Sequence, residues 1–440
     1  MGEAVRTALV DGARAPGVAG LLARGGELDA EAASESERSL LIRTGLARRK
    51  GGVLRALARA DAWDGLLYLH DAAQGEEGRD TVYGVGPNTK ALLRMTPRVP
   101  GERALDVGCG QGMCAFTSAR HCAVSVGSDI NRRAVHLARV GGALNGLTGA
   151  EFRAGALLQP VAGETFDLVT CNAPFVFSGT RSVHEGGAAG SGDDFTRALL
   201  EGLPSALREG GFAAVLCNWE HERADDWSGE MRALLEGGAC DAWVVRLRTS
   251  TTAGVQERWF ADARDPDVRD ESADVESLRR WREHLHARER HLTMGFVFLR
   301  RRSGRTWFRA DTQRLTPGDE PAGAQVEAVF RAETFVRSLA DESVLDHVYE
   351  PACDRREREE ERGMVITEHA RGLRFSMAME APVRRVLGAF DGERTARRVL
   401  HDVFGDDGGP HAPRIVTELL RRGYIAASGR TGDGQASRAG

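Results

Sequence analysis

The sequence has very little lysine, no net positive charge and no long apolar run, and each shortage narrows what the chain can be. Lys50 and Lys90 are the only lysines among 440 residues, and the formal net charge is −5. A chain with this charge has no global basic field for tight nonspecific binding of nucleic acid. No apolar run approaches the ~20 residues that a membrane-spanning helix needs, so we expect no membrane partner.

Cysteine is present but forms no disulfide or metal pattern. The seven cysteines include no Cys-x-x-Cys pair, and the N-terminal residues lack the short apolar core of a secretory signal. An odd number of thiols suits a reducing compartment better than a disulfide framework, so we expect a cytoplasmic protein. The histidines and acids after residue 219 show no metal-ligand spacing, and no metal is assigned.

The length predicts more than one domain, because 440 residues exceed the usual size of about 150 residues per domain. The expected segments are a small helical or winged-helix domain over residues 1–97, an α/β core over 98–310 with an insertion at 248–292, a connecting segment over 311–362, a winged-helix-like unit over 363–428 and a disordered tail over 429–440. The mixed-charge run from Arg355 to Arg362 is typical of a solvated helix or linker.

The core segment alternates short apolar runs with helical stretches. The clearest runs are RALDV, AVSVGSD, FDLVTC, FAAVLCN, AWVVRL and MGFVFL. Strands that alternate with helices predict an α/β fold with a parallel sheet and crossover helices.

A glycine-rich sequence, Asp106-Val-Gly-Cys-Gly-Gln-Gly112, follows the first of these strands. Glycines there let the backbone turn tightly and approach a ligand where Cβ atoms would clash. Gly110, Gly112 and Ala115 also satisfy the dinucleotide pattern G-x-G-x-x-A. A carboxylate at position 106, however, would repel a pyrophosphate but could accept from an ammonium group, which favours S-adenosylmethionine over NAD. The residues expected to shape its methionine end are Asp106, Gly108, Gly110 and Gly112.

Asp129 ends the next predicted strand, 23 residues after Asp106. An acidic residue at this spacing can bind both hydroxyls of an adenosine ribose. The alternative is an Asp that caps a helix beginning at Ile130. The third strand region carries Ala156 where such sites often have an acid for the adenine amino group, so adenine must be recognised by other groups.

The tetrapeptide Asn172-Ala173-Pro174-Phe175 follows the strand FDLVTC. The side-chain carbonyl of Asn172 and a nearby backbone carbonyl can accept both hydrogens of a planar amino group while Phe175 stacks on its face. This grip would orient the nitrogen lone pair toward an electrophilic methyl group. We therefore predict Asn172, Pro174 and Phe175 as the catalytic motif, with Asn172 also beside the cofactor.

Together, these motifs resemble those of class I S-adenosylmethionine-dependent methyltransferases of the methyltransferase small domain group, which includes the release-factor glutamine N5-methyltransferases and the ribosomal RNA guanine-N2 methyltransferases. The resemblance implies a seven-stranded Rossmann-like sheet, the cofactor at the glycine loop and the target nitrogen at the tetrapeptide. That tetrapeptide is usually Asn-Pro-Pro-Phe/Tyr in the family, whereas Ala173 replaces the first proline here. The overall layout is similar to that of large actinobacterial methyltransferases.

Three further features are candidate parts of the substrate site. His184 lies in a glycine-containing stretch that is interpreted either as a flexible lip or as a plain loop. Trp219, at the carboxyl end of FAAVLCN, would either wall the substrate pocket or pack in the core. The stretch from Tyr83 to Lys90 lies where relatives contact cofactor or substrate, and its alternative is a helix capped by Asn88 or Thr89.

The sequence thus predicts a methyltransferase that uses S-adenosyl-L-methionine to methylate a planar amide or amino nitrogen. The methyl acceptor could be a protein, an RNA or a small natural product. The alternatives are a binding protein that keeps the cofactor fold without turnover and reads peptide or nucleic acid, and, third, a Rossmann oxidoreductase.

Overall fold

The computed structural model describes residues 17–72, 81–174, 192–251, 290–312, 320–340, 342–359, 364–405 and 408–431. The chain forms two compact units, one of residues 1–93 and 98–312 and the other of residues 94–97 and 313–440. Residues 17–72 belong to the same unit as the α/β core. No helix among the described residues is both long and apolar enough to cross a bilayer.

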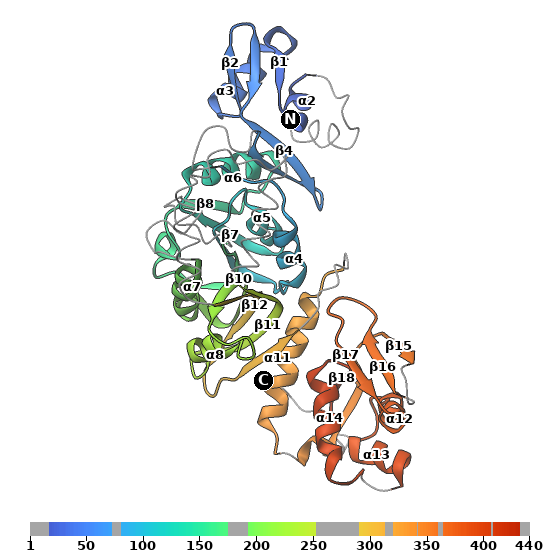
Figure 1. Ribbon diagram of the computed structural model, residues 1–440. Helices are drawn as coiled ribbons and strands as arrows, with labels where there is room; N and C mark the ends of the chain where they lie inside the picture. Colours follow the sequence, from blue (N-terminus) through green and yellow to red (C-terminus); the bar gives the residue numbers. More distant parts are fainter. Residues whose placement is uncertain are drawn as a thin grey trace. The chain divides into compact units, whose positions relative to one another are not determined.

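The first unit is built on a mixed sheet, whose described part has the strand order β13-β11-β12-β10-β9-β6-β7-β8 (Figure 1). Its strands are β6 (Gly101–Val107), β7 (Cys122–Asp129), β8 (Ala150–Ala154), β9 (Phe166–Asn172), β10 (Leu207–His221), β11 (Cys240–Thr251), β12 (His291–Arg301) and β13 (Phe308–Thr312). Its helices are α4 (Pro87–Met95), α5 (Met113–Ser118), α6 (Arg132–Leu144), α7 (Gly192–Ala206) and α8 (Gly229–Leu235), with a short 3-10 turn, η2 (Gln159–Val161).

Two expectations about the sheet are corrected. The sheet is not purely parallel, because β12 runs antiparallel to both β10 and β11, and an apolar run does not encode strand direction. It also has an eighth strand, β13, which pairs in parallel with β11. The sequence FRADT of β13 is short and mostly polar, so it gave no apolar run to recognise.

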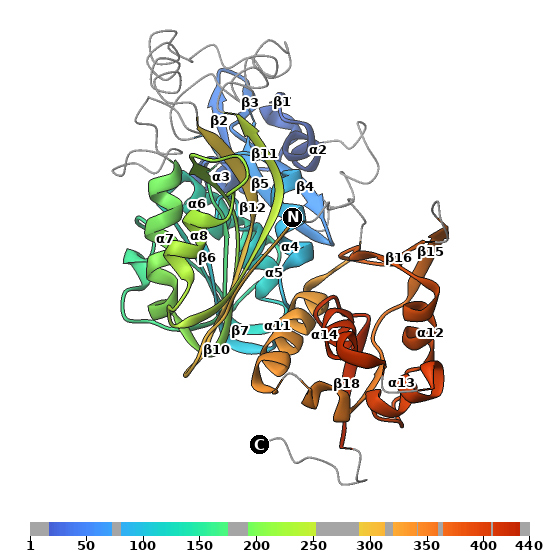
Figure 2. The same ribbon diagram turned by 60° about the horizontal axis from the view of Figure 1, so that its bottom comes forward.

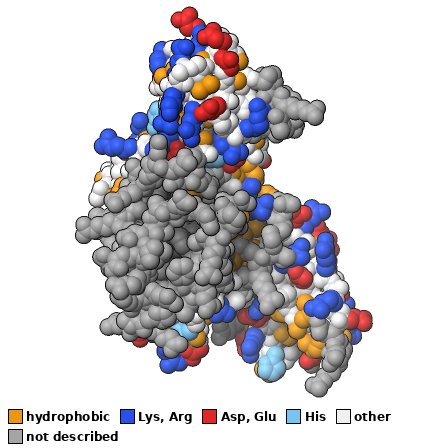
Figure 3. Space-filling model, turned by 45° about the horizontal axis from the view of Figure 1, so that its top comes forward, with side chains coloured by type: hydrophobic (Ala, Val, Ile, Leu, Met, Phe, Trp, Pro, Cys, Tyr) orange, Lys and Arg blue, Asp and Glu red, His pale blue; other side chains and the backbone are white. Residues whose placement is uncertain are grey.

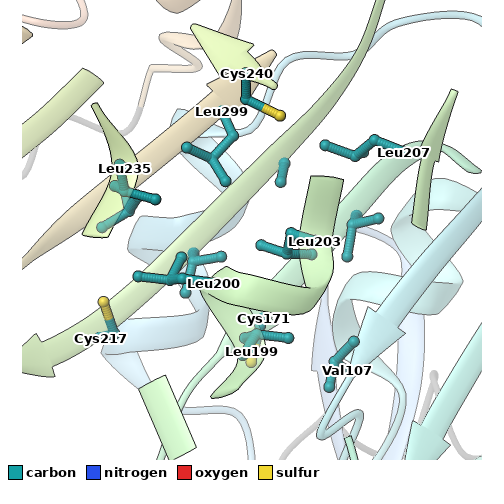
Figure 4. Packing of buried hydrophobic residues seen from close by; sticks show 14 of the residues in the cluster. Val107, Cys171, Leu199, Leu200, Leu203, Leu207, Cys217, Leu235, Cys240 and Leu299 are labelled. Atoms are coloured by element: carbon teal, nitrogen blue, oxygen red, sulfur yellow. The ribbon is translucent and has the colours of Figure 1, made fainter. Parts of the chain in front are cut away.

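The core of the sheet is covered by α7 and α8. Leu199, Leu200 and Leu203 of α7 are fully or almost fully buried against residues of the central strands, including Val107 and Cys171. Figure 4 shows these leucines turned toward the strands. The amphipathic spacing of apolar residues along α7 explains this packing.

The N-terminal elements form a small sheet of order β1-β3-β2 and a hairpin of β4 and β5. They are α2 (Gly17–Arg24), β1 (Glu27–Asp29), η1 (Ala30–Ala32), α3 (Glu35–Arg43), β2 (Ala47–Lys50), β3 (Val53–Ala56), β4 (Ala58–Trp63) and β5 (Leu66–Asp71). The hairpin turns at Asp64-Gly65, where both φ angles are positive, as a two-residue turn between twisted strands requires. These elements share one hydrophobic cluster with Ala134 and Leu137 of α6.

The second unit combines helices with two small sheets (Figure 2). Its elements are α11 (Gly323–Ser338), η4 (Ser343–Asp346), β14 (His347–Pro351), β15 (Arg355–Glu359), β16 (Val365–His369), β17 (Ser376–Met379), α12 (Ala381–Ala389), α13 (Ala396–Phe404), η6 (Gly409–His411), α14 (Ala412–Arg421) and β18 (Ile425–Thr431). Residues of α12, α13 and α14 pack in one hydrophobic cluster.

The described part of the mixed-charge run, residues 355–359, is a strand rather than the expected helix or linker, since β15 pairs antiparallel with β16. Four of the five residues of β15 are exposed and all are charged. Charged side chains are a common protection of edge strands, and this explains why the run mimics a solvated helix. Figure 3 likewise shows basic and acidic side chains interspersed among the described residues of one face, without a continuous basic surface.

Candidate functional site

The candidate site lies where the strand order reverses at the middle of the sheet. β6 pairs in parallel with β7 on one side and with β9 on the other. The carboxyl ends of strands at such a reversal are where open α/β sheets bind their ligands. Asp106, Asp129 and Asn172 lie at or next to the carboxyl ends of these three strands.

The glycines of the loop after β6 have two different structural roles. Gly108 and Gly110 have φ angles of +69° and +51°, and an added Cβ would meet no described atom within 4 Å. Gly112, with φ of +89°, would place a Cβ only 2.8 Å from the Phe116 ring. The first two glycines therefore leave an open cradle of backbone, whereas the third permits close packing of α5 on the loop.

Asp106 is a buried carboxylate beneath this loop. Its Oδ2 accepts from the Ala115 N–H at 3.2 Å and its Oδ1 from the Thr170 hydroxyl at 3.1 Å. Burial raises the pKa of Asp106 to about 7, against the opposing effect of these hydrogen bonds. Such a group would gain from a nearby cation, because a positive charge stabilises the ionised form.

Asp129 fastens the glycine loop to the end of β7. One of its oxygens accepts from the Gly110 N–H at 2.8 Å and the other from the Asn131 N–H at 2.8 Å. The helix-cap alternative for Asp129 is wrong, because α6 begins at Arg132 and Asn131 caps it by accepting from the Arg133 and Ala134 N–H groups. Asp129 is thus a carboxylate of the loop, placed beside the cradle.

Ile130 is a candidate that sequence reasoning missed. It follows Asp129 directly, and 40% of its surface is exposed, which makes it one of few large apolar side chains exposed among the described residues. The available signal was its position next to the predicted ribose acid. Its apolar surface could contact a planar base where Ala156 offers no acid.

Asn172, the last residue of β9, has one satisfied and one unsatisfied end. Its Nδ2 donates to the Thr89 hydroxyl at 3.0 Å, while its Oδ1 is buried without a hydrogen-bond partner among the described residues. A buried acceptor without a donor is costly, and it is common where a ligand completes the hydrogen bond. The backbone beyond is held by the Ala173 N–H, which donates to the Leu216 carbonyl at 2.9 Å, and Pro174 is half-buried. Phe175 and His184 lie outside the described residues.

The segment from Tyr83 to Lys90 is tied to both halves of the site. The Gln111 side chain of the glycine loop donates to the Gly84 carbonyl at 3.1 Å, and Thr89 meets Asn172. The expected cap at Asn88 or Thr89 is not observed, since α4 begins at Pro87 and both residues lie in its first turn. Proline suits that first helical position because it lacks an N–H.

Trp219 is fully buried in the sheet core, where its Nε1–H donates to the Trp227 carbonyl at 2.7 Å. Of its two interpretations, these contacts match packing. We therefore leave Trp219 out of the site.

The described residues fit a cationic nucleoside ligand of the S-adenosylmethionine type. The buried Asp106 carboxylate suits an ammonium group. A carboxylate such as Asp129 can accept about four hydrogen bonds, and ribose hydroxyls are donors of the required kind. The open backbone at Gly108 and Gly110 has room that a Cβ would fill.

Comparisons with known proteins agree with this geometry. Residues 82–223 match the family model "Methyltransferase small domain". The release factor glutamine methyltransferase of Xylella fastidiosa (strain 9a5c) is 29% identical over 146 residues, which cover 30% of this chain and 51% of that protein. The ribosomal RNA small subunit methyltransferase C of Alcanivorax borkumensis is 32% identical over 121 residues, or 28% of this chain and 33% of that protein.

The chain spans about half the length of the first of these curated relatives, or 51% of it. Among solved structures, a 16S rRNA N2 methyltransferase of T. thermophilus in complex with AdoMet and guanosine matches with a TM-score of 0.31 and 20% identity, covering 67% of this chain and 68% of that one.

Proposed function

We propose, on the premise that residues 82–223 form a class I S-adenosylmethionine-dependent methyltransferase domain of the methyltransferase small type, that this chain methylates a planar amide or amino nitrogen. The acceptor would belong to a protein, an RNA or a natural product. The names of the two curated relatives, one acting on a release-factor glutamine and the other on ribosomal RNA, support this chemical class.

One observation carries the proposal. Asn172 Oδ1 is a buried acceptor without a partner among the described residues, at the strand end next to the glycine cradle. A planar nitrogen with a hydrogen to donate would satisfy it, and an acceptor-only group would not. Asn172 therefore suits the binding of an N–H nucleophile.

Each residue of the site has a distinct part in this reaction. Asp106 would accept from the ammonium of the cofactor, and Asp129 from its ribose hydroxyls. Asn172 Oδ1 would accept from the target N–H and so orient the nitrogen lone pair, which is a contribution of positioning rather than of proton abstraction. When bound, S-adenosylmethionine supplies a methyl group activated by its sulfonium.

Pro174 and Phe175 complete the proposed grip on the acceptor. Pro174 confines Ala173 to extended backbone conformations, which fixes the path of the chain after Asn172. Phe175 is proposed to stack on the planar target, as aromatic rings do with flat π systems. His184 is proposed to line the substrate side.

The test is methyl transfer from radiolabelled S-adenosylmethionine into host extract, divided into nuclease-treated, protease-treated and small-molecule fractions. We expect label in one fraction, and Asn172→Ala should lower its incorporation at least 100-fold while changing the cofactor Kd less than threefold. Equal loss of cofactor binding and turnover in that variant would contradict the assignment. Label on oxygen, or cofactor binding with no label anywhere, would replace it with an O-methyltransferase or a cofactor-binding protein.

A further inference from the structure

Thr89 is the side chain that holds the buried amide of Asn172. The two residues are 83 positions apart in the sequence, and the Asn172 Nδ2 lies 3.0 Å from the Thr89 Oγ1. Thr89 is in the first turn of α4, outside the glycine loop and the tetrapeptide. Neither motif therefore predicts that this residue contacts the target-binding Asn.

The hydrogen bond determines which end of the amide faces the site. An Asn side chain has one acceptor oxygen and one donor nitrogen. With the nitrogen engaged by Thr89, the oxygen is the end without a described partner. An amide held in this way presents its oxygen, so it can bind a nucleophile that carries a hydrogen to donate.

Thr89 is in turn held by its surroundings. The backbone just before α4 is fixed at two points, where Gln111 donates to the Gly84 carbonyl at 3.1 Å and the Asp61 carboxylate accepts from the Val85 N–H at 2.9 Å. His70, whose Nε2 lies 3.5 Å from the Asp61 carboxylate, keeps the pKa of Asp61 below its usual value. Asp61 therefore stays ionised and a strong acceptor near neutral pH.

We infer that Thr89 is a positioning residue that holds the Asn172 amide with its oxygen toward the methyl acceptor, and so favours an acceptor group that carries a hydrogen to donate, as the proposed N–H does. This inference rests on the proposed function, because it assigns a role to the same Asn. Thr89 acts through Asn172 and contacts neither reacting atom.

A first experiment reads the contact without any substrate. The chain has five asparagines, at 88, 131, 145, 172 and 218, so a sample labelled with 15N only in asparagine gives five side-chain amide pairs by NMR, and Asn172→Ala identifies the pair of Asn172. In the wild type that amide should exchange its hydrogens slowly. Thr89→Val should shift its signals and speed the exchange at least tenfold, and Thr89→Ser should restore both.

Thr117→Val is the matched control for this experiment. Thr117 is buried, and its hydroxyl donates to the Met113 carbonyl at 3.0 Å within α5. Removing that hydroxyl should leave the Asn172 signals unchanged. An Asn172 amide that exchanges rapidly in the wild type, or that is unaffected by Thr89→Val, would overturn the inference and leave the proposed function intact.

A second experiment measures turnover on the acceptor fraction that the wild type labels. Thr89→Val should lower kcat about tenfold and change KM and the cofactor Kd less than twofold, because the hydrogen bond orients the nucleophile rather than binding it. Thr89→Ser should recover most of kcat. If Thr89→Val turns over as fast as the wild type, the inference about Thr89 is overturned and the proposed function stands. If the wild type itself methylates no nitrogen, the proposed function is overturned.

Discussion

The carboxyl ends of β6 and β9 are neighbours in the sheet, but the hydrogen bonding of their polar side chains differs. In the segment that follows β6, the Ala115 N–H donates to Asp106 and the Gly110 N–H donates to Asp129 at the end of β7. At the end of β9, Asn172 receives one partner from a distant helix and keeps a buried oxygen without a described partner. The polar groups at the first end are satisfied within the protein, whereas the second end keeps an acceptor that a ligand could satisfy.

If the proposed function holds, this difference shows how the cofactor and the methyl acceptor would each be recognised. A site formed by backbone and internal hydrogen bonds suits a cofactor of constant shape. Because such a site is ordered before binding, it loses little conformational entropy on binding. An unsatisfied acceptor selects a chemical group, since only a donor removes its desolvation cost. The cofactor can therefore be assigned from this half of the site, while the identity of the acceptor depends on what else surrounds Asn172.

The sharpest way to break the comparison is a pair of variants with opposite effects. Asp129→Ala should weaken cofactor binding about 100-fold, because a charged acceptor of ribose hydroxyls is lost together with the anchor of Gly110. Titration calorimetry with S-adenosylhomocysteine measures this directly. Asn172→Ala is the control, with cofactor affinity retained and turnover lost, and equal cofactor affinities in the two variants would show that the strand ends are not functionally distinct.

A second prediction divides the glycine loop itself. Gly110→Ala should weaken cofactor binding tenfold or more, because its Cβ would occupy the open cradle, at a strain of about 1 kcal/mol for the left-handed backbone. Gly112→Ala should instead lower the Tm by roughly 5 °C, since its Cβ would lie 2.8 Å from Phe116. Calorimetry and thermal denaturation of both variants test the division, and a Gly110→Ala protein with normal affinity contradicts it.

A third prediction concerns pH. The pKa of Asp106 is raised to about 7 by burial, and a bound ammonium would favour its ionised form. Cofactor affinity should therefore be about tenfold weaker at pH 6 than at its plateau above pH 7. The charge of Asp129 raises the pKa of this carboxyl group and Cys114 lowers it, so Asp106→Asn is the control and should remove the dependence.

The raised pKa of Asp106 also makes the stability of the free protein depend on pH. Because the folded state binds the Asp106 proton more tightly than the unfolded chain does, this group stabilises the fold fully below its ordinary pKa, and the contribution is lost as the pH rises to about 7. Asp106→Asn should accordingly raise the Tm of the free protein more at pH 8 than at pH 5.5. An unchanged difference between the two pH values would mean that Asp106 titrates normally.

The sequence predicted that Asp106, the glycine loop and Asp129 lie together, but not that Thr89 contacts Asn172, and the reason is locality. Asp106, the glycines and Asp129 lie at strand ends within one stretch of chain, so spacing alone brings them together. The contact between Thr89 and Asn172 joins positions 83 residues apart, which no spacing rule predicts. The alternation of charge in β15 likewise hid a strand, because edge strands and solvated helices share that composition.

The smallest expected effect concerns Ile130, a side chain proposed to contact the cofactor. Ile130 exposes 40% of its surface directly after Asp129, and covering that surface with a flat base would be worth about 1 kcal/mol. Ile130→Ser should therefore weaken S-adenosylhomocysteine binding about fivefold. Ile42→Ser is the matched control, because Ile42 of α3 is 45% exposed and belongs to no part of the site, so it should bind normally. Since Ile130 has no hydrogen bond to contribute, a loss much larger than fivefold would mean that it shapes the loop rather than contacts the base, and no loss would place adenine elsewhere.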